Sequence, residues 1–167
     1  MTKITLKTAT IFVWSFGVAA LIFVLVLTSA AVPFNNITLR NFSQQLFEAP
    51  IPGNTVIVER HSTANNFTLR RGNSLDFLAV ILVRSEQTKY ELQEHFESLD
   101  FRRARGVESL NGVEVLPQTN NRLDASLFWR ISNEFFSEDI NFSQGNYFTV
   151  YILDRGYSAL FDARGWE

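Results

Sequence analysis

The stretch ATIFVWSFGVAALIFVLVLTSAAV, residues 9–32, decides the architecture of this chain. It contains no charged residue, and 13 of its 24 residues are Leu, Ile, Val or Phe. A helix of this length measures about 36 Å, which exceeds the roughly 30 Å of a bilayer's hydrocarbon core. A helix of a soluble domain needs a polar face wherever it meets water, and this stretch has none. The sequence therefore predicts a transmembrane helix over residues 9–32, with the lipid bilayer as its partner.

The charges that flank this stretch predict which way it crosses the membrane. Lys3 and Lys7 precede it, and the next charged residue is Arg40. Because positive charge is retained on the cytoplasmic side, residues 1–8 are expected in the cytoplasm. The rest of the chain is then expected outside the cell membrane.

Whether the stretch is retained or removed stays open at this point. Two lysines, an apolar run and the small residues Ser29, Ala30 and Ala31 also describe a secretory signal peptide, and cleavage after Ala31 would release a secreted protein. The apolar run is longer than the roughly 7–15 residues of a cleaved signal. Its length favours a retained signal anchor.

Composition limits what the remaining chain can be. The 167 residues carry a formal net charge of −2 and contain no cysteine. A disulfide scaffold, a cysteine zinc site and a thiol nucleophile are thereby excluded. The charge balance also argues against a broadly basic nucleic-acid binder, so no nucleic-acid partner is expected.

Residues 33–54 are predicted to connect the membrane segment to a folded domain. The segment begins at Pro33 and ends in a run of structure breakers, Pro50, Pro52 and Gly53. Between them, Ile37, Phe42, Leu46 and Phe47 fall near helical spacing. A short amphipathic helix is expected there, lying on the membrane surface or packing on the domain, with packing slightly preferred.

Residues 55–167 are predicted to form one extracytoplasmic α+β domain. Thr88 and Glu91 have the spacing of a capping box and indicate a helix. Alternating or continuous apolar runs predict strands before and after it. These strands are expected over residues 55–61, 75–83, 113–116, 127–131 and 147–153. The expected order is β-β-α-β-β-β, a small, mostly antiparallel sheet covered by one helix.

The sequence contains no recognisable catalytic motif. His61 and His95 stand apart, and neither belongs to a His-x-x-x-His pair that would place two metal ligands on one face of a helix. No glycine cluster resembles a phosphate loop, and no serine lies in a Gly-x-Ser-x-Gly turn. No cofactor and no metal are therefore expected, and a non-enzymatic role is favoured.

Two charged stretches are predicted to form an interaction surface. The first is a cluster of arginines, and the second is a run of Asp, Arg and Tyr near the C-terminus. Their members are Arg102, Arg103 and Arg105, and Asp154, Arg155, Tyr157, Asp162 and Arg164. Arginine and tyrosine recur at binding hot spots, and clustered positive charge attracts anionic polymers. The alternatives are solvated charge after a helix end for the first stretch and a structural ion-pair corner for the second.

Three functions remain open from the sequence. The favoured one is a single-pass envelope protein whose domain binds a protein or an anionic surface polymer without catalysis. The second is an accessory subunit of a larger membrane complex, in which small residues such as Gly17 and Ala20 pack against other helices. The third is a membrane-tethered hydrolase that uses His61 or His95 with a carboxylate.

Overall fold

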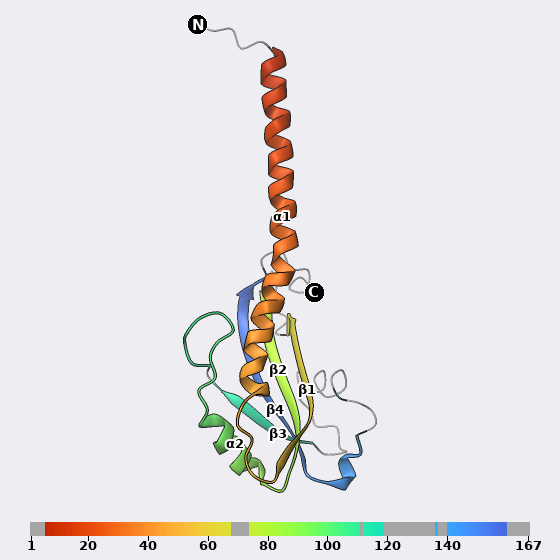
Figure 1. The fold of residues 1–167 in the computed structure, drawn as a ribbon, viewed down its shortest axis with the longest axis vertical. Helices are drawn as coiled ribbons and strands as arrows, with labels where there is room; N and C mark the ends of the chain where they lie inside the picture. The colour runs from red at the N-terminus through yellow and green to blue at the C-terminus, as the bar shows by residue number, and fades with distance from the viewer. Residues whose placement is uncertain (1–5, 68–73, 111, 119–135, 137–139, 160–167) are drawn as a thin grey trace.

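A long helix and a small sheet are the largest elements of the described part of the chain (Figure 1). The computed structural model describes residues 6–67, 74–110, 112–118, 136 and 140–159. Over these residues the structure is a mixed α+β fold, with one long apolar helix at the N-terminus and an antiparallel four-stranded sheet. The predicted strand over residues 127–131 lies outside the described residues.

The N-terminal helix α1 runs from Leu6 to Phe47 and has two different halves (Figure 1). Its first half projects away from the sheet, and every large apolar side chain from Trp14 to Val26 is at least half exposed. Its second half lies on the sheet and buries residues that recur every three or four positions. They are Ala31, Asn35, Thr38, Phe42 and Leu46. By length and composition, α1 is able to cross a membrane.

The continuity of α1 through Pro33 differs from the prediction, which ended the helix at Val32 and began a connector there. Proline removes one backbone hydrogen bond, here the bond to the carbonyl of Ser29. The side chains that follow are anchored on the sheet, and their burial outweighs this local cost, which is about 3 kcal/mol. The residues predicted as a separate short helix are therefore the last turns of α1.

The sheet is antiparallel throughout and has the order β1-β2-β4-β3. Its strands are β1 (Thr55–Asn65), β2 (Ser74–Ser85), β3 (Val113–Gln118) and β4 (Tyr147–Ser158). The nine residues 75–83 of β2 are all buried, which confirms a strand covered on both faces. Strand β3 continues through Pro117, where the prediction ended it, because β3 lies at an edge of the sheet, a position that tolerates proline.

A second helix, α2 (Lys89–Glu97), lies between β2 and β3 in the chain. Its capping box forms as predicted: Glu91 N donates to Thr88 Oγ1 at 3.3 Å, and Thr88 N donates to Glu91 Oε2 at 2.8 Å. The hydrogen bonds that the Thr88 backbone N–H and the Thr88 hydroxyl donate to Glu91 Oε2 lower the pKa of Glu91. The local pairing fixes where the helix begins.

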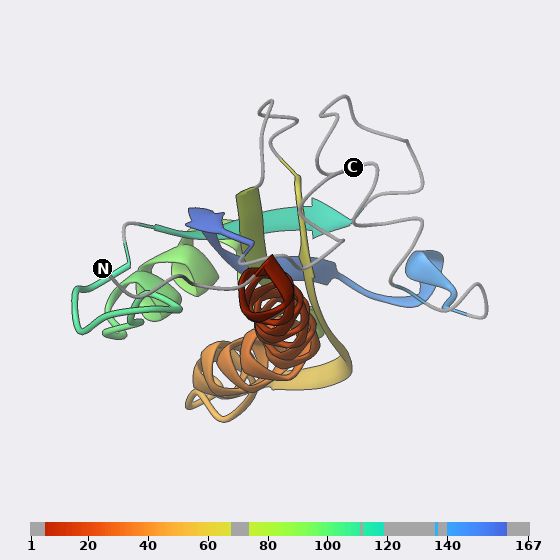
Figure 2. The ribbon, with the colours of Figure 1, turned by 90° about the horizontal axis from the view of Figure 1, so that it is seen from above.

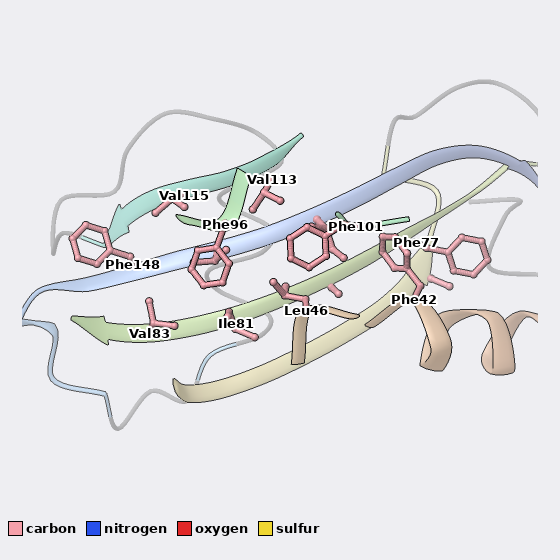
Figure 3. Packing of buried hydrophobic residues seen from close by; sticks show 14 of the residues in the cluster. Phe42, Leu46, Phe77, Ile81, Val83, Phe96, Phe101, Val113, Val115 and Phe148 are labelled. Atoms are coloured by element: carbon pink, nitrogen blue, oxygen red, sulfur yellow. The ribbon is translucent and has the colours of Figure 1, made fainter. Parts of the chain in front are cut away.

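Two helices cover the same face of the sheet (Figure 2): α2, the one helix predicted for the domain, and the last turns of α1, where the sequence predicted a short helix with packing on the domain slightly preferred. Phe42 and Leu46 of α1 and Phe96 of α2 share one core with Phe77 and Ile81 of β2 (Figure 3). A smaller cluster, comprising Leu78, Val80 and Tyr151, lies on alternate positions of the same strands. Since side chains alternate along a strand, this second cluster belongs to the opposite face.

Candidate functional site

The candidate site lies where β4 extends past its edge partner. Strand β3 begins at Val113, which pairs with Ile152, so residues 153–158 of β4 continue beyond it. The segment between α2 and β3 lies beside this extension, and Ala104 N donates to Asp154 Oδ2 at 2.7 Å. The two predicted charged stretches, 52 residues apart at their starting residues Arg102 and Asp154, therefore meet in space.

Asp154 lies at the centre of the contact between the two charged stretches. It is only 4% exposed. Its carboxylate accepts hydrogen bonds from the guanidinium of Arg103, with Nε at 3.2 Å, and from the hydroxyl of Tyr157. The bond to Asp154 raises the pKa of Arg103, and burial followed by the bond to Asp154 raises the pKa of Tyr157. An ion-pair corner, the alternative considered for the second stretch, therefore involves Asp154 and Tyr157 of that stretch together with Arg103 of the first.

Arg105 joins this corner to the long helix. Its guanidinium donates to Asn35 Oδ1 on α1 and to the carbonyl of Ser158 on β4, the latter at 3.1 Å. Its Cζ atom lies 5.3 Å from the ring centroid of Phe34 and 5.2 Å from that of Tyr157, both within cation–π range. Burial lowers the pKa of Arg105. One side chain thus holds the α2–β3 segment, β4 and α1 together.

The remaining predicted site residues have different surroundings. Arg102 is exposed, and Gln45 of α1 bonds to both its backbone N–H, at 2.7 Å, and its carbonyl, at 3.2 Å. Arg155 is exposed on β4. Asp162 and Arg164 lie outside the described residues.

A groove with a volume of about 500 Å³ opens beside the buried corner. Residues of the α2–β3 segment, β3 and β4 form its walls. They are Arg103, Glu108, Ser109, Leu110, Gly112, Glu114, Tyr151, Leu153, Asp154 and Arg155. Two guanidinium groups and three carboxylates thus line one concave surface.

Sequence reasoning missed Glu108, Glu114 and Tyr151 at this groove. Tyr151 lies directly opposite Glu114 in the β3–β4 pairing and donates its hydroxyl proton to the Glu114 carboxylate. Burial and this hydrogen bond raise the pKa of Tyr151. The sequence does not show which residue of β4 lies opposite Glu114, because the register of the two strands cannot be read from a polar residue on an edge strand.

Asp76 of β2 binds the C-terminal end of β4, the end that carries Asp154. It is fully buried and accepts hydrogen bonds from Gly156 N at 2.8 Å and Phe67 N at 3.1 Å. The β2–β4 register shifts at this point, and Gly156 adopts a φ of 86° that favours glycine. The strand therefore passes through Gly156 and ends at Ser158, beyond the predicted end at residue 153.

The stability of this region is expected to fall in alkaline solution. Tyr151 and Tyr157 both have a raised pKa in the folded state, so the fold favours their protonated forms. This contribution is present below about pH 10, the ordinary tyrosine pKa, and is lost as the pH rises above it. Denaturant titrations of the full chain in detergent should show a midpoint that declines as the pH rises above about 10.

The double substitution Tyr151→Phe and Tyr157→Phe should flatten this decline, since the two raised groups are then absent. Tyr90→Phe is the matched control, because the Tyr90 side chain is 82% exposed. A decline that is equally steep in the double variant would contradict the assignment.

The two histidines do not share a site. His61 Nε2 lies 3.2 Å from Glu59 Oε2 on β1, and His95 Nε2 lies 2.8 Å from the carbonyl oxygen of Pro50. Among the described residues, no group of three or more His, Cys, Asp or Glu side chains is placed to hold a metal ion.

No family model matches this chain, and no similar protein was found among curated proteins or solved structures. The functional proposal is therefore carried by the residues described above.

Proposed function

We propose that this protein is a single-pass membrane anchor that displays an extracytoplasmic domain, and that the domain binds another protein or an anionic surface polymer without catalysis. The observation that carries the proposal is the division of α1. One half exposes an unbroken apolar surface, and the other half is part of the domain core. A helix that is apolar all round and not covered by protein is suited to a lipid environment.

Retention of the anchor is supported by the helix that runs through the predicted cleavage position. Ala31 is 4% exposed and belongs to the buried face of α1, and Asn35 one turn later is fully buried. Cleavage after Ala31 would cut inside a helix whose next turns are packed on the sheet. A retained chain of about 19.1 kDa in the membrane fraction is expected, and a species that begins at Val32 would contradict it.

The orientation can be tested by cysteine labelling, because the chain has no cysteine of its own. Val107 is 84% exposed on the α2–β3 segment. In intact cells, a membrane-impermeant maleimide should label Val107→Cys fully and leave Thr2→Cys unlabelled until the membrane is permeabilised. The reverse pattern would place the domain in the cytoplasm.

Binding is proposed to occur at the groove beside β4. Arg155 is exposed at its rim, while Arg103 and Asp154 lie in its wall. Exposed arginines next to a concave surface can form paired hydrogen bonds with carboxylates or phosphates, the anionic groups of proteins and surface polymers. Three carboxylates at the same surface would restrict which anions fit.

Site-specific photo-crosslinking in cells tests this surface. The full chain carries a photoreactive phenylalanine at position 155 in one variant and at position 90, on exposed Tyr90 of α2, in the other. The expected result is an adduct of defined mass from position 155 that is absent from position 90. Arg155→Glu should reduce binding of the captured partner at least several-fold, whereas Arg60→Glu on β1 should not. Equal adducts from both positions, or none from position 155, would refute the groove as the binding surface.

A further inference from the structure

We propose that the end of the domain nearest the membrane rests among the lipid headgroups of the outer leaflet, with Phe34 and Ile37 in contact with lipid. This inference rests on the proposed anchor and adds where the domain sits relative to the bilayer. It makes the lipid surface a second partner of the domain, separate from the groove.

The apolar surface of α1 does not stop where the domain begins. Phe34 is 49% exposed and Ile37 is 62% exposed, although Asn35 and Thr38, in the same turns, are buried against the domain. Large apolar side chains on the outer face of a helix are unfavourable in water. The exposed positions that follow, Arg40 and Asn41, are polar. Asn36 is an exposed polar residue within this stretch, and Ile37, inside the domain, is the last exposed large apolar side chain of α1.

The dimensions of a bilayer agree with an apolar surface that ends at Ile37. A hydrocarbon core of about 30 Å takes about 20 helical residues, so a span that ends at Ala31 begins near residue 11 and leaves Lys7 on the cytoplasmic side. Phe34 then lies about 4.5 Å beyond the core and Ile37 about 9 Å beyond it. Since the headgroup layer is about 5–8 Å thick on each side, Phe34 falls inside this layer, and Ile37 lies just beyond it, close enough for its side chain to reach the headgroups.

The domain itself reaches this level of the helix. Asn35 Nδ2 donates to the carbonyl of Ala159, just after β4, at 3.2 Å. Arg105 stacks on the ring of Phe34, with its Cζ 5.3 Å from the ring centroid. A guanidinium beside exposed apolar rings matches the mixture of phosphate and acyl carbon at a bilayer surface. The apolar face is continuous with the membrane-spanning half of α1, so lipid is a closer match to it than a soluble partner.

Tryptophan quenching by brominated lipids tests the position of the domain. Trp14, Trp129 and Trp166 are replaced by Phe in the full chain, and a single Trp is introduced as Phe34→Trp or Ile37→Trp. The control is Val58→Trp on β1, because Val58 has a similar exposure of 41% and lies toward the opposite end of the sheet. In phosphatidylcholine vesicles, bromine near the carbonyl end of the acyl chain should quench the Trp at position 34 several-fold more than the Trp at position 58.

The native Trp14 separates failure of this inference from failure of the anchor. A chain that keeps Trp14 alone should be quenched by brominated lipid whenever α1 is inserted. If Trp14 is quenched and position 34 is quenched no more than position 58, the anchor holds and the proposed contact is refuted. If neither Trp14 nor position 34 is quenched, the anchor fails too.

A spin label gives the same answer without a new tryptophan. The chain has no cysteine, so a nitroxide can be attached at Ile37→Cys alone. Its collision rate with a water-soluble relaxing agent should be several-fold lower in vesicles than that of a nitroxide at Val58→Cys. Equal collision rates at the two positions would overturn the proposal.

Discussion

Replacing Asp154 with alanine is expected to lower the free energy of unfolding by about 3 kcal/mol, the low end of what breaking a buried ion pair costs. The change removes the acceptor for three donors at once: the Arg103 guanidinium, the backbone N–H of Ala104 and the Tyr157 hydroxyl. The low end applies because the Arg103 side chain is 37% exposed and water reaches it after the change. Denaturant unfolding of the full chain in detergent, followed by near-ultraviolet circular dichroism, measures the difference.

The neighbouring residue supplies the control for this prediction. Arg155→Ala alters an exposed side chain one position along β4, and its effect should stay within about 0.5 kcal/mol. If Asp154→Ala and Arg155→Ala had equal effects, Asp154 would not hold the α2–β3 segment against β4.

Phe42→Ala is expected to cost about 3–5 kcal/mol, the usual range for removing a buried phenylalanine side chain. Phe42 is 1% exposed, and its ring centroid lies 6.5 Å from that of Phe77 on β2. The cavity would open between α1 and the sheet, so amide hydrogen exchange should accelerate in residues 35–47 of α1 before it does in β2.

Asn41→Ala is the matched control for Phe42→Ala, because Asn41 is the preceding residue of α1 and its side chain is exposed. Its effect should be below about 0.5 kcal/mol. Comparable losses in the two variants would show that the second half of α1 is not part of the core.

The apolar helix and the start of α2 were predictable because each is determined locally. The apolar character of the helix depends only on neighbouring residues, and residues 9–32 carry it without help from the rest of the chain. The capping box joins Thr88 to Glu91 only three positions away. Both signals are complete within a short window of sequence.

The end of α1 was not predictable from its own residues. A proline favours the end of a helix, and in residues 30–36 nothing local opposes it. The helix continues past Pro33 because Phe42 and Leu46 pack against a sheet whose strands come later in the chain. Tertiary burial, which a local rule cannot include, decides this boundary.

The candidate site was predictable in its parts but not in its assembly. Arg103, Arg105, Asp154 and Tyr157 were all selected for their charge or aromatic character. These residues come together because β4 extends beyond β3 and because the α2–β3 segment packs beside that extension. Glu114 and Tyr151 depend in the same way on strand register.

The unbroken passage of α1 from its apolar half into the core fixes the rotation of the domain about the axis of that half, and therefore about the membrane normal if α1 spans a bilayer as we propose. Because an α-helix advances by about 1.5 Å and turns by about 100° per residue, one alanine added among residues 24–28 would swing the groove through more than a quarter of a circle while lifting it only slightly. A partner embedded in the same bilayer would then face a different wall of the protein, whereas a diffusing polymer would meet the groove as before.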